Sequence, residues 1–294
     1  MSRFCCCFSG GGSAEKMSKV SSEASNGSTK TAPTTAGQEN RSKSSAKGPS
    51  PVLVEHFTSQ GCSSCPSSDL LLSKLGQESV RGSTSGEDEA TTTAGTPPLI
   101  VLAYHVDYWD YLGWKDPFAN HRWSSRQRAY GEALQQDSIY TPEVVVQGRS
   151  HCIGSNEDNV SALIKDAPQF PALDLRVSFK RPSPSDLEMS LSLSCKLKVE
   201  GNLDVMVAVF ENGQVTDCGK GENRGRVLTN DFIVRSLDKA CTLQNGQTKK
   251  AQGQVSIKLW DGYSKTKCGM AVFLQNPLTM EVYGAQLVHL PDDI

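Results

Sequence analysis

The chain has 294 residues, 37% of them hydrophobic and 21% charged, so it can bury a sizeable core, and its length favours two domains. A formal net charge of −2 and an isoelectric point near 6.2 give no reason to expect nucleic acid as a partner. The sequence has no run approaching the roughly 20 apolar residues that a membrane-spanning helix needs.

Residues 1–50 are expected to form a disordered tail, because they are rich in Ser, Thr, Gly and Lys and poor in aromatic residues. The apolar run at the N-terminus is too short for a secretory signal, so we expect no export by that route. Cys5, Cys6 and Cys7 lie between two phenylalanines and are candidate sites of S-acylation, which would tether the chain to a membrane. We therefore expect a cytoplasmic protein, with membrane association or organellar import as alternatives.

The ordered part is predicted to begin with a strand at residues 51–57, which is apolar on both faces like a central strand of a covered parallel sheet. A helix follows and is expected to end near Leu75. Because proline favours the first helical turn, this helix is expected to begin near Ser63 or Ser64. Residues 76–98 are polar and low in complexity, which predicts a surface insertion.

Two further strand and helix pairs follow the insertion. They are predicted as strands at residues 99–104 and 143–147 and helices at residues 123–136 and 156–166. Alternation of strand and helix predicts an α/β domain over residues 51–170.

Residues 171–294 have a different pattern. Apolar residues at alternate positions from Leu187 to Val199 predict a half-buried antiparallel strand. Other short strands are predicted at residues 174–179, 203–210, 227–235, 254–260, 270–274 and 282–290. This many short strands predicts a β-rich, sandwich-like domain that packs on the α/β domain.

Cys62 and Cys65 form a Cys-x-x-Cys pair where the first predicted strand gives way to a helix. The N-H groups and dipole of a helix N-terminus stabilise a thiolate, which is the species that attacks disulfides. Cys62 lies at the mouth of the helix and is the expected nucleophile, and Cys65 is the expected resolving thiol. A strand before the pair and a helix after it are the thioredoxin-like arrangement.

Other residues are predicted to complete this catalytic site. Thr141 and Pro142 directly precede a predicted strand, where thioredoxin-like domains have a cis-proline that faces the dithiol. An ordinary trans proline at the start of an edge strand is the alternative. Glu55 and His56 point to opposite faces of the strand before Cys62, so one of them is a candidate to relay a proton to the leaving sulfur. The alternative is a hydrogen-bonded or solvated polar residue.

An aromatic segment at residues 104–118 follows a central strand, at the end where α/β proteins form ligand sites. Its candidate substrate-binding residues are His105, Asp107, Tyr108, Trp109 and Trp114. In a functional role the segment would grip a peptide or a small disulfide. In a structural role it would pack against the β-rich domain, since aromatic side chains serve both purposes through the same apolar burial.

Four blocks of sequence, at residues 54–66, 104–118, 140–142 and 222–235, closely resemble a family of bacterial proteins, many of them exported, known as domain of unknown function 1223. The resemblance runs from about Val52 to the end of the chain. It implies a thioredoxin-like N-terminal domain followed by a β-rich domain, and it supplies no substrate. Because this chain lacks a signal peptide, the resemblance does not imply a periplasmic location.

The leading hypothesis is a thiol-disulfide oxidoreductase without a cofactor, whose partner is a disulfide-containing protein or a small thiol. One alternative is a copper or zinc binding or delivery module that uses Cys62, Cys65 and His105. Another is a non-catalytic interaction protein, in which the dithiol senses redox state and the β-rich domain recruits a partner.

Overall fold

The structure is a computed structural model that describes residues 40–44, 48–84, 97–195, 197, 199–244 and 249–291. Residues 38–294 form one compact unit, a mixed α/β fold in which strands predominate. Among the described residues, no helix combines the length and the apolar composition that crossing a membrane requires. Cys5, Cys6 and Cys7, the candidate acylation sites, lie outside the described residues.

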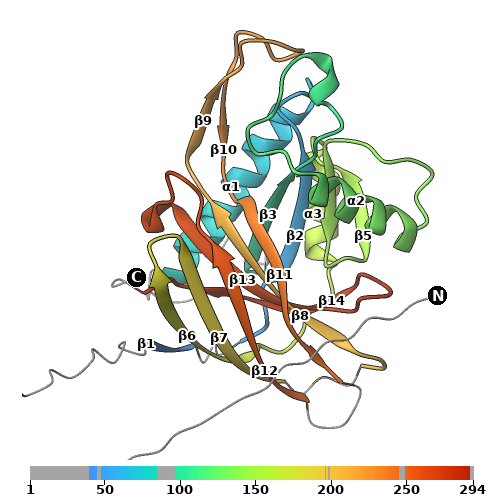
Figure 1. The fold of residues 1–294 in the computed structure, drawn as a ribbon. Helices are drawn as coiled ribbons and strands as arrows, with labels where there is room; N and C mark the ends of the chain where they lie inside the picture. Colours follow the sequence, from blue (N-terminus) through green and yellow to red (C-terminus); the bar gives the residue numbers. More distant parts are fainter. Residues whose placement is uncertain are drawn as a thin grey trace, which may run out of the picture. The chain divides into compact units, whose positions relative to one another are not determined.

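One eight-stranded mixed sheet organises the fold (Figure 1), in the order β14-β13-β8-β11-β3-β2-β4-β5. Its strands are β2 (Val52–Thr58), β3 (Leu99–His105), β4 (Glu143–Val146), β5 (Ser150–Ile153), β8 (Leu203–Glu211), β11 (Ile233–Leu243), β13 (Cys268–Gln275) and β14 (Val282–Val288). The central strands β2 and β3 are parallel and buried at every position. Their largely apolar sequences predicted this burial, because both faces of a central parallel strand are covered.

In the part of the chain that the structure describes, three α-helices accompany the large sheet: α1 (Cys65–Thr84), α2 (His121–Ala133) and α3 (Glu157–Lys165). The predictions of α2 and α3 are confirmed to within a few residues at each end. The helix α1, however, continues to Thr84, beyond its predicted end near Leu75 and into the first part of the predicted insertion at residues 76–98. Residues 85–96 of that insertion lie outside the described residues. Gly76 does not end this helix. A Cβ at that position would lie 2.5 Å from the ring of Phe232, so the glycine allows α1 to pack closely on its neighbour.

A four-stranded sheet, in the order β1-β6-β7-β12, packs against part of the large sheet. Its strands are β1 (Asn40–Ser44), β6 (Asp174–Ser183), β7 (Asp186–Cys195) and β12 (Lys249–Lys258). Burial alternates along β7 as predicted and also along the first half of β6, and their inward side chains share one apolar cluster with β8 and β13. The strand β1 lies within the tail that was predicted to be disordered; it pairs with β6 through backbone hydrogen bonds, which do not require apolar residues.

A two-stranded arm, defined as residues 214–230, contains β9 (Gln214–Asp217) and β10 (Val227–Asn230) and extends beside α1 (Figure 1). The sequence predicted a single strand at 227–235, but Asp231 and Phe232 interrupt it and divide it into β10 and β11. The Asp231 carboxylate accepts hydrogen bonds from Gly213 N at 2.7 Å and Gln77 Nε2 at 2.9 Å, and Phe232 has a φ of 56°. This turn separates the arm from β11.

The large sheet contains strands from both sides of the predicted domain boundary at residues 170/171. Ile233 in β11 pairs in parallel with Ala103 in β3, and Phe232 O accepts a hydrogen bond from Ala103 N at 2.8 Å. Strands from both predicted domains therefore share one sheet, which brings the arm next to the start of α1.

Substitution of Gly76 tests the packing of α1. We expect Gly76→Val to lower the free energy of unfolding by about 1–3 kcal/mol, because the added side chain must displace the ring of Phe232. Glu78→Val is the matched control, since it adds the same β-branched side chain to an exposed position of α1. Urea unfolding of both variants measures the difference, and equal losses would contradict this account.

Candidate functional site

The two cysteines lie at the start of α1. Cys65 is the first residue of the helix, one or two residues later than the predicted start, and its N-H donates to Cys62 O at 3.3 Å. Cys62 is only 3% exposed and Cys65 is fully buried, and both are free thiols in this structure. The pair therefore occupies the positions predicted for it, with Cys62 before the helix and Cys65 inside it.

Cys62 faces the segment that contains Pro142. Its sulfur lies 3.2 Å from Ser64 Oγ and 3.7 Å from the carbonyl oxygen of Thr141. The peptide bond between Thr141 and Pro142 is cis, as predicted. Trp109 Nε1 donates a hydrogen bond to Thr141 Oγ1 at 2.7 Å, which fixes the aromatic segment against this side of the site.

The two thiols have different proton affinities. A hydrogen bond from the Cys65 thiol, opposed by burial and assisted by Ser64 and Thr141, lowers the pKa of Cys62 to about 5. Burial, the hydrogen bond to Cys62 and the nearby carboxylate of Asp69 raise the pKa of Cys65 well above its usual range. At neutral pH, Cys62 is therefore a thiolate and Cys65 is a protonated thiol.

Asp69 is a carboxylic acid whose charge raises the pKa of Cys65, and it could not be assigned to the site from the sequence alone. It lies one helical turn after Cys65, a spacing that places both side chains on the same face of α1. Its Oδ1 accepts a hydrogen bond from Thr58 Oγ1 at 2.7 Å and lies 3.1 Å from His56 Nε2. Burial raises the pKa of Asp69 to about 7, although the nearby His105 opposes this shift.

His56 and Glu55 point to opposite faces of β2, as predicted. His56 is fully buried on the α1 side, and burial lowers its pKa to about 3, so it is neutral. Glu55 points to the α2 side, where it accepts a hydrogen bond from Arg126 Nε at 2.7 Å and another from the hydroxyl of Tyr130. Of these two candidate proton-relay residues, His56 therefore contacts the acid beneath the dithiol, and Glu55 belongs to a buried ion pair.

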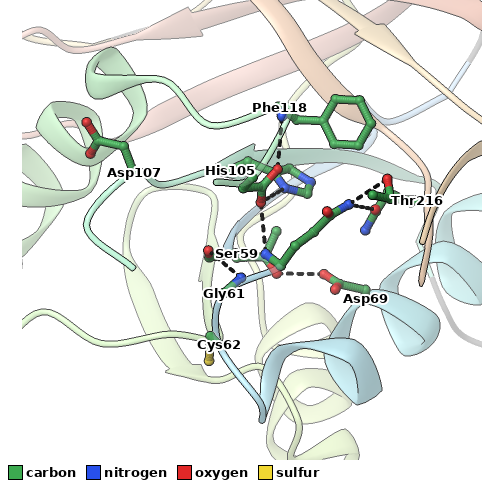
Figure 2. A network of polar contacts seen from close by, with 12 residues as sticks. Ser59, Gly61, Cys62, Asp69, His105, Asp107, Phe118 and Thr216 are labelled. Carbon is green, nitrogen blue, oxygen red and sulfur yellow. Dashed lines mark hydrogen bonds and ion pairs between the residues drawn. The ribbon is translucent and has the colours of Figure 1, made fainter. Parts of the chain in front are cut away.

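His105 and Asp116 form another buried pair, next to the loop before Cys62 (Figure 2). His105 Nδ1 is 2.7 Å from Asp116 Oδ2, and the same oxygen accepts a hydrogen bond from Gln60 N at 2.8 Å. Burial opposes protonation of His105, but the negative charge of Asp116 outweighs it and raises the pKa of His105. His105 was predicted to bind substrate, but it is 1% exposed and stabilises the loop before Cys62 instead.

His56, Asp69 and His105 line a common internal cavity of about 10 Å³. One ring nitrogen of each histidine, His56 Nδ1 and His105 Nε2, has no hydrogen-bond partner among the described residues. A cavity of this size holds about one water molecule. Asp69 thus borders a small polar space beneath the dithiol.

The backbone before Cys62 is bound by residues of the arm. Asn223 Nδ2 donates to Gln60 O and to Cys62 O, both at 2.9 Å. The carboxylate of Glu222 accepts a hydrogen bond from Ser63 N at 3.0 Å. Sequence reasoning did not assign these contacts, because they join residues about 160 positions apart; the only signal was the block at residues 222–235 in the family resemblance.

The side chain of Gln60 links the same loop to both strands of the arm and to the aromatic segment. Its Nε2 donates to Thr216 Oγ1 at 3.0 Å and to Asn230 Oδ1 at 2.7 Å (Figure 2). Its Oε1 accepts from Trp114 Nε1 at 3.2 Å. The loop that contains Cys62 is therefore fixed by side chains from three distant segments.

The predicted substrate-binding residues have separate positions. Trp109 and Trp114 contact the site through Thr141 and Gln60, as described above. Tyr108 lies beside Trp109, with ring centroids 6.0 Å apart, and its hydroxyl donates to Gln127 Oε1 at 3.0 Å. Burial raises the pKa of Tyr108, and Cys65 and Thr141 are close enough to affect this pKa as well. Asp107 lies apart from the network (Figure 2), 3.4 Å from the imidazole of His121.

Together these features define a mixed α/β protein with a Cys-x-x-Cys pair opposite a cis-proline. The family model of DUF1223, a protein of unknown function, matches residues 53–275. The chain belongs to this family.

Two solved structures are similar to this chain. Protein AGR_C_4864 from Agrobacterium tumefaciens is 27% identical, with a TM-score of 0.56 over 84% of this chain and 97% of that one. HBP35 of Porphyromonas gingivalis is 12% identical, with a TM-score of 0.54 over 83% of this chain and 76% of that one, a likeness of fold alone. A search of curated proteins found no match.

The hydrogen bond from Ser64 can be tested by titration of Cys62. We expect Ser64→Ala to raise the pKa of Cys62 by about 0.5–1 unit, because a net hydrogen bond contributes about 0.5–1.5 kcal/mol. Ser63→Ala is the control, since only the backbone N-H of Ser63 forms a described contact. The ultraviolet absorbance of the thiolate and the rate of alkylation should both fall as the pH drops through the pKa.

The structural role of Glu55 is tested by Glu55→Gln. This change leaves Arg126 as a buried charge without a counter-ion, so we expect a loss of about 3–5 kcal/mol in the free energy of unfolding. Glu281→Gln breaks a half-exposed ion pair and should cost about 0–1 kcal/mol. If Glu55 instead served the dithiol, its substitution would alter the pKa of Cys62 with little change in stability.

Proposed function

We propose that this protein is a thiol-disulfide oxidoreductase. The observation that supports it best is the position of Cys62, which precedes α1 and lies 3.7 Å from the carbonyl oxygen of the cis Thr141–Pro142 peptide. A nucleophile in this position has the helix N-terminus on one side and an extended backbone segment on the other. The 27% identical relative and the family match name no activity, so the proposal rests on the site.

We also propose that residues 52–165 form a thioredoxin-like domain. Strand β2 is joined through α1 to the parallel strand β3, and the antiparallel strands β4 and β5 lie on the other side of β2 before α3. The two packed sheets of the C-terminal part support a sandwich-like description of that region.

The proposed reaction begins with attack of the Cys62 thiolate on one sulfur of a substrate disulfide. A mixed disulfide forms, and the other substrate sulfur leaves as a thiolate. Cys65 then loses its proton and attacks Cys62 Sγ, which expels the second substrate sulfur and leaves a disulfide between the two cysteines. Two electrons pass from the dithiol to the substrate.

In the second step, the proposed acceptor of the Cys65 proton is Asp69. This carboxyl lies on the same face of α1 as Cys65, and its pKa of about 7 matches the pH at which a general base works best. Thr58 and His56 fix its orientation. The neighbouring cavity gives the proton a polar space to enter after transfer.

Trapping of the mixed disulfide tests the proposal. The Cys65→Ser variant should accumulate a mixed disulfide on Cys62 when it is mixed with hydroxyethyl disulfide, and Cys62→Ser should accumulate none. Mass spectrometry of the intact protein measures both. If the wild-type protein forms no disulfide between Cys62 and Cys65 across a glutathione redox series, the proposed function is wrong.

The role of Asp69 is tested in the resolving step alone. In the Asp69→Asn variant, we expect a preformed mixed disulfide on Cys62 to be resolved by Cys65 about 10²-fold more slowly, because a general base typically contributes 10²–10⁴-fold. The wild-type rate should rise as the pH passes through about 7, where Asp69 ionises, and the variant should lose this inflection. Asp166→Asn, at the exposed end of α3, is the control.

The two alternative hypotheses make other predictions. A metal module would need a third ligand beside the two thiols, and the described residues contain no group of three or more metal-ligating side chains. A redox sensor would form the same internal disulfide with negligible turnover, so multiple-turnover kinetics with a regenerating reductant separate it from an oxidoreductase.

A further inference from the structure

A hollow at the arm is lined by residues 219–222, Leu112 and Arg224, and has a volume of about 600 Å³. It lies between the tip of the arm and the short 3-10 helix Asp110–Leu112. No residue of this hollow was identified as a site from the sequence. Its volume is large enough for a small peptide.

The hollow is connected to the loop of the proposed nucleophile through backbone contacts. Glu222, one of its lining residues, accepts a hydrogen bond from Ser63 N, and the adjacent Asn223 donates to Cys62 O. Cys62 itself is only 3% exposed. A recessed sulfur favours a slender substrate over a broad, flat protein surface.

The charges at the rim of the hollow are predominantly positive. Lys220 and Arg224 are both exposed, and neither has an ion-pair partner in the part of the chain that the structure describes. Glu222 supplies the opposing charge, and one of its oxygens already accepts the hydrogen bond from Ser63. Two free cations therefore face a single, partly engaged carboxylate.

Glycines keep the floor of the hollow open. A Cβ at Gly219 would have only the ring of Trp114 within 4 Å, at 3.9 Å. Gly221 has a φ of 74°, and its backbone packs so closely on Trp114 that a Cβ would lie 2.9 Å from the tryptophan Cβ. The backbone of residues 219–221 thus packs on Trp114, and the exposed Lys220 and Arg224 belong to the same loop.

We propose that this hollow binds the carboxylate groups of a small anionic disulfide, such as the disulfide of glutathione, and directs one of its sulfurs to Cys62. The inference rests on the proposed function. Arg224 offers the planar donor pair that suits a carboxylate, and Lys220 adds a point charge. Glutathione has more carboxylate than ammonium groups, so it complements two cations and one carboxylate.

The electron balance follows from the proposed reaction. The Cys62 thiolate attacks one sulfur of glutathione disulfide, which forms a protein-glutathione mixed disulfide and releases one glutathione thiolate. Cys65 gives its proton to Asp69 and displaces the second glutathione as a thiolate. The dithiol loses two electrons, and the disulfide gains them.

Three disulfides of similar reactivity and different charge test the inference on the full chain. Glutathione disulfide is anionic, hydroxyethyl disulfide is neutral and cystamine is cationic. Stopped-flow kinetics of the reduced protein give a rate constant for each. We expect the wild-type protein to react faster with glutathione disulfide than with cystamine, and this preference should shrink at high salt, because exposed charges are screened.

The double variant Lys220→Glu/Arg224→Glu should lower the ratio of the glutathione disulfide rate to the cystamine rate by about tenfold or more, since a locally reversed field changes encounter rates by 10–10³-fold. The matched control, Lys165→Glu/Lys180→Glu, changes the net charge equally at exposed positions on α3 and β6, and should keep the wild-type ratio.

Two outcomes overturn the inference in distinguishable ways. An unchanged ratio in the arm variant, even if all three rates fall together, means that Lys220 and Arg224 do not select charge, and the proposed oxidoreductase activity stands without this substrate class. A wild-type protein that fails to react even with the neutral disulfide removes the proposed function and this inference with it.

Discussion

The hydrogen bonds of Asn223 to the carbonyl oxygens of Gln60 and Cys62 are the constraint on which the site depends. One amide from the arm fixes the backbone on which the first cysteine lies, and Asp116 fixes the same backbone through Gln60 N. Because both contacts are buried, their loss would leave polar groups unsatisfied at the centre of the structure. The geometry of the dithiol thus depends on side chains that lie far from it in the sequence.

Neighbouring side chains of β2 point to opposite faces of the sheet and have different roles. On one face of β2, Glu55 and Arg126 neutralise each other and bind α2 to the sheet. On the other face, His56 contacts an acid whose proton affinity lies near neutrality. Period-two geometry places adjacent polar residues in unrelated environments, so one supports the fold while the other borders the proposed chemistry.

Local features were predictable from the sequence and distant ones were not. Largely apolar runs identified β2 and β3, and residue order alone placed Cys62 before a helix and Pro142 before a strand. The predicted end of α1 was too early because glycine commonly marks the end of a helix. Here Gly76 instead lies inside the helix, where the ring of Phe232 leaves no room for a side chain. Asn223 and Glu222 were missed because no local pattern reveals a contact across about 160 residues.

The parallel pairing of Ile233 with Ala103 gives the two halves of the chain a mutual dependence. Without the C-terminal half, Ala103 N would lose its hydrogen bond to Phe232 O, and β3, which is buried at every position, would become the exposed edge of the sheet, a surface prone to aggregation. The C-terminal half protects this edge by joining the sheet. Insertion, loss or exchange of that half during evolution would therefore have to preserve β11, whatever else changed in the β-rich region.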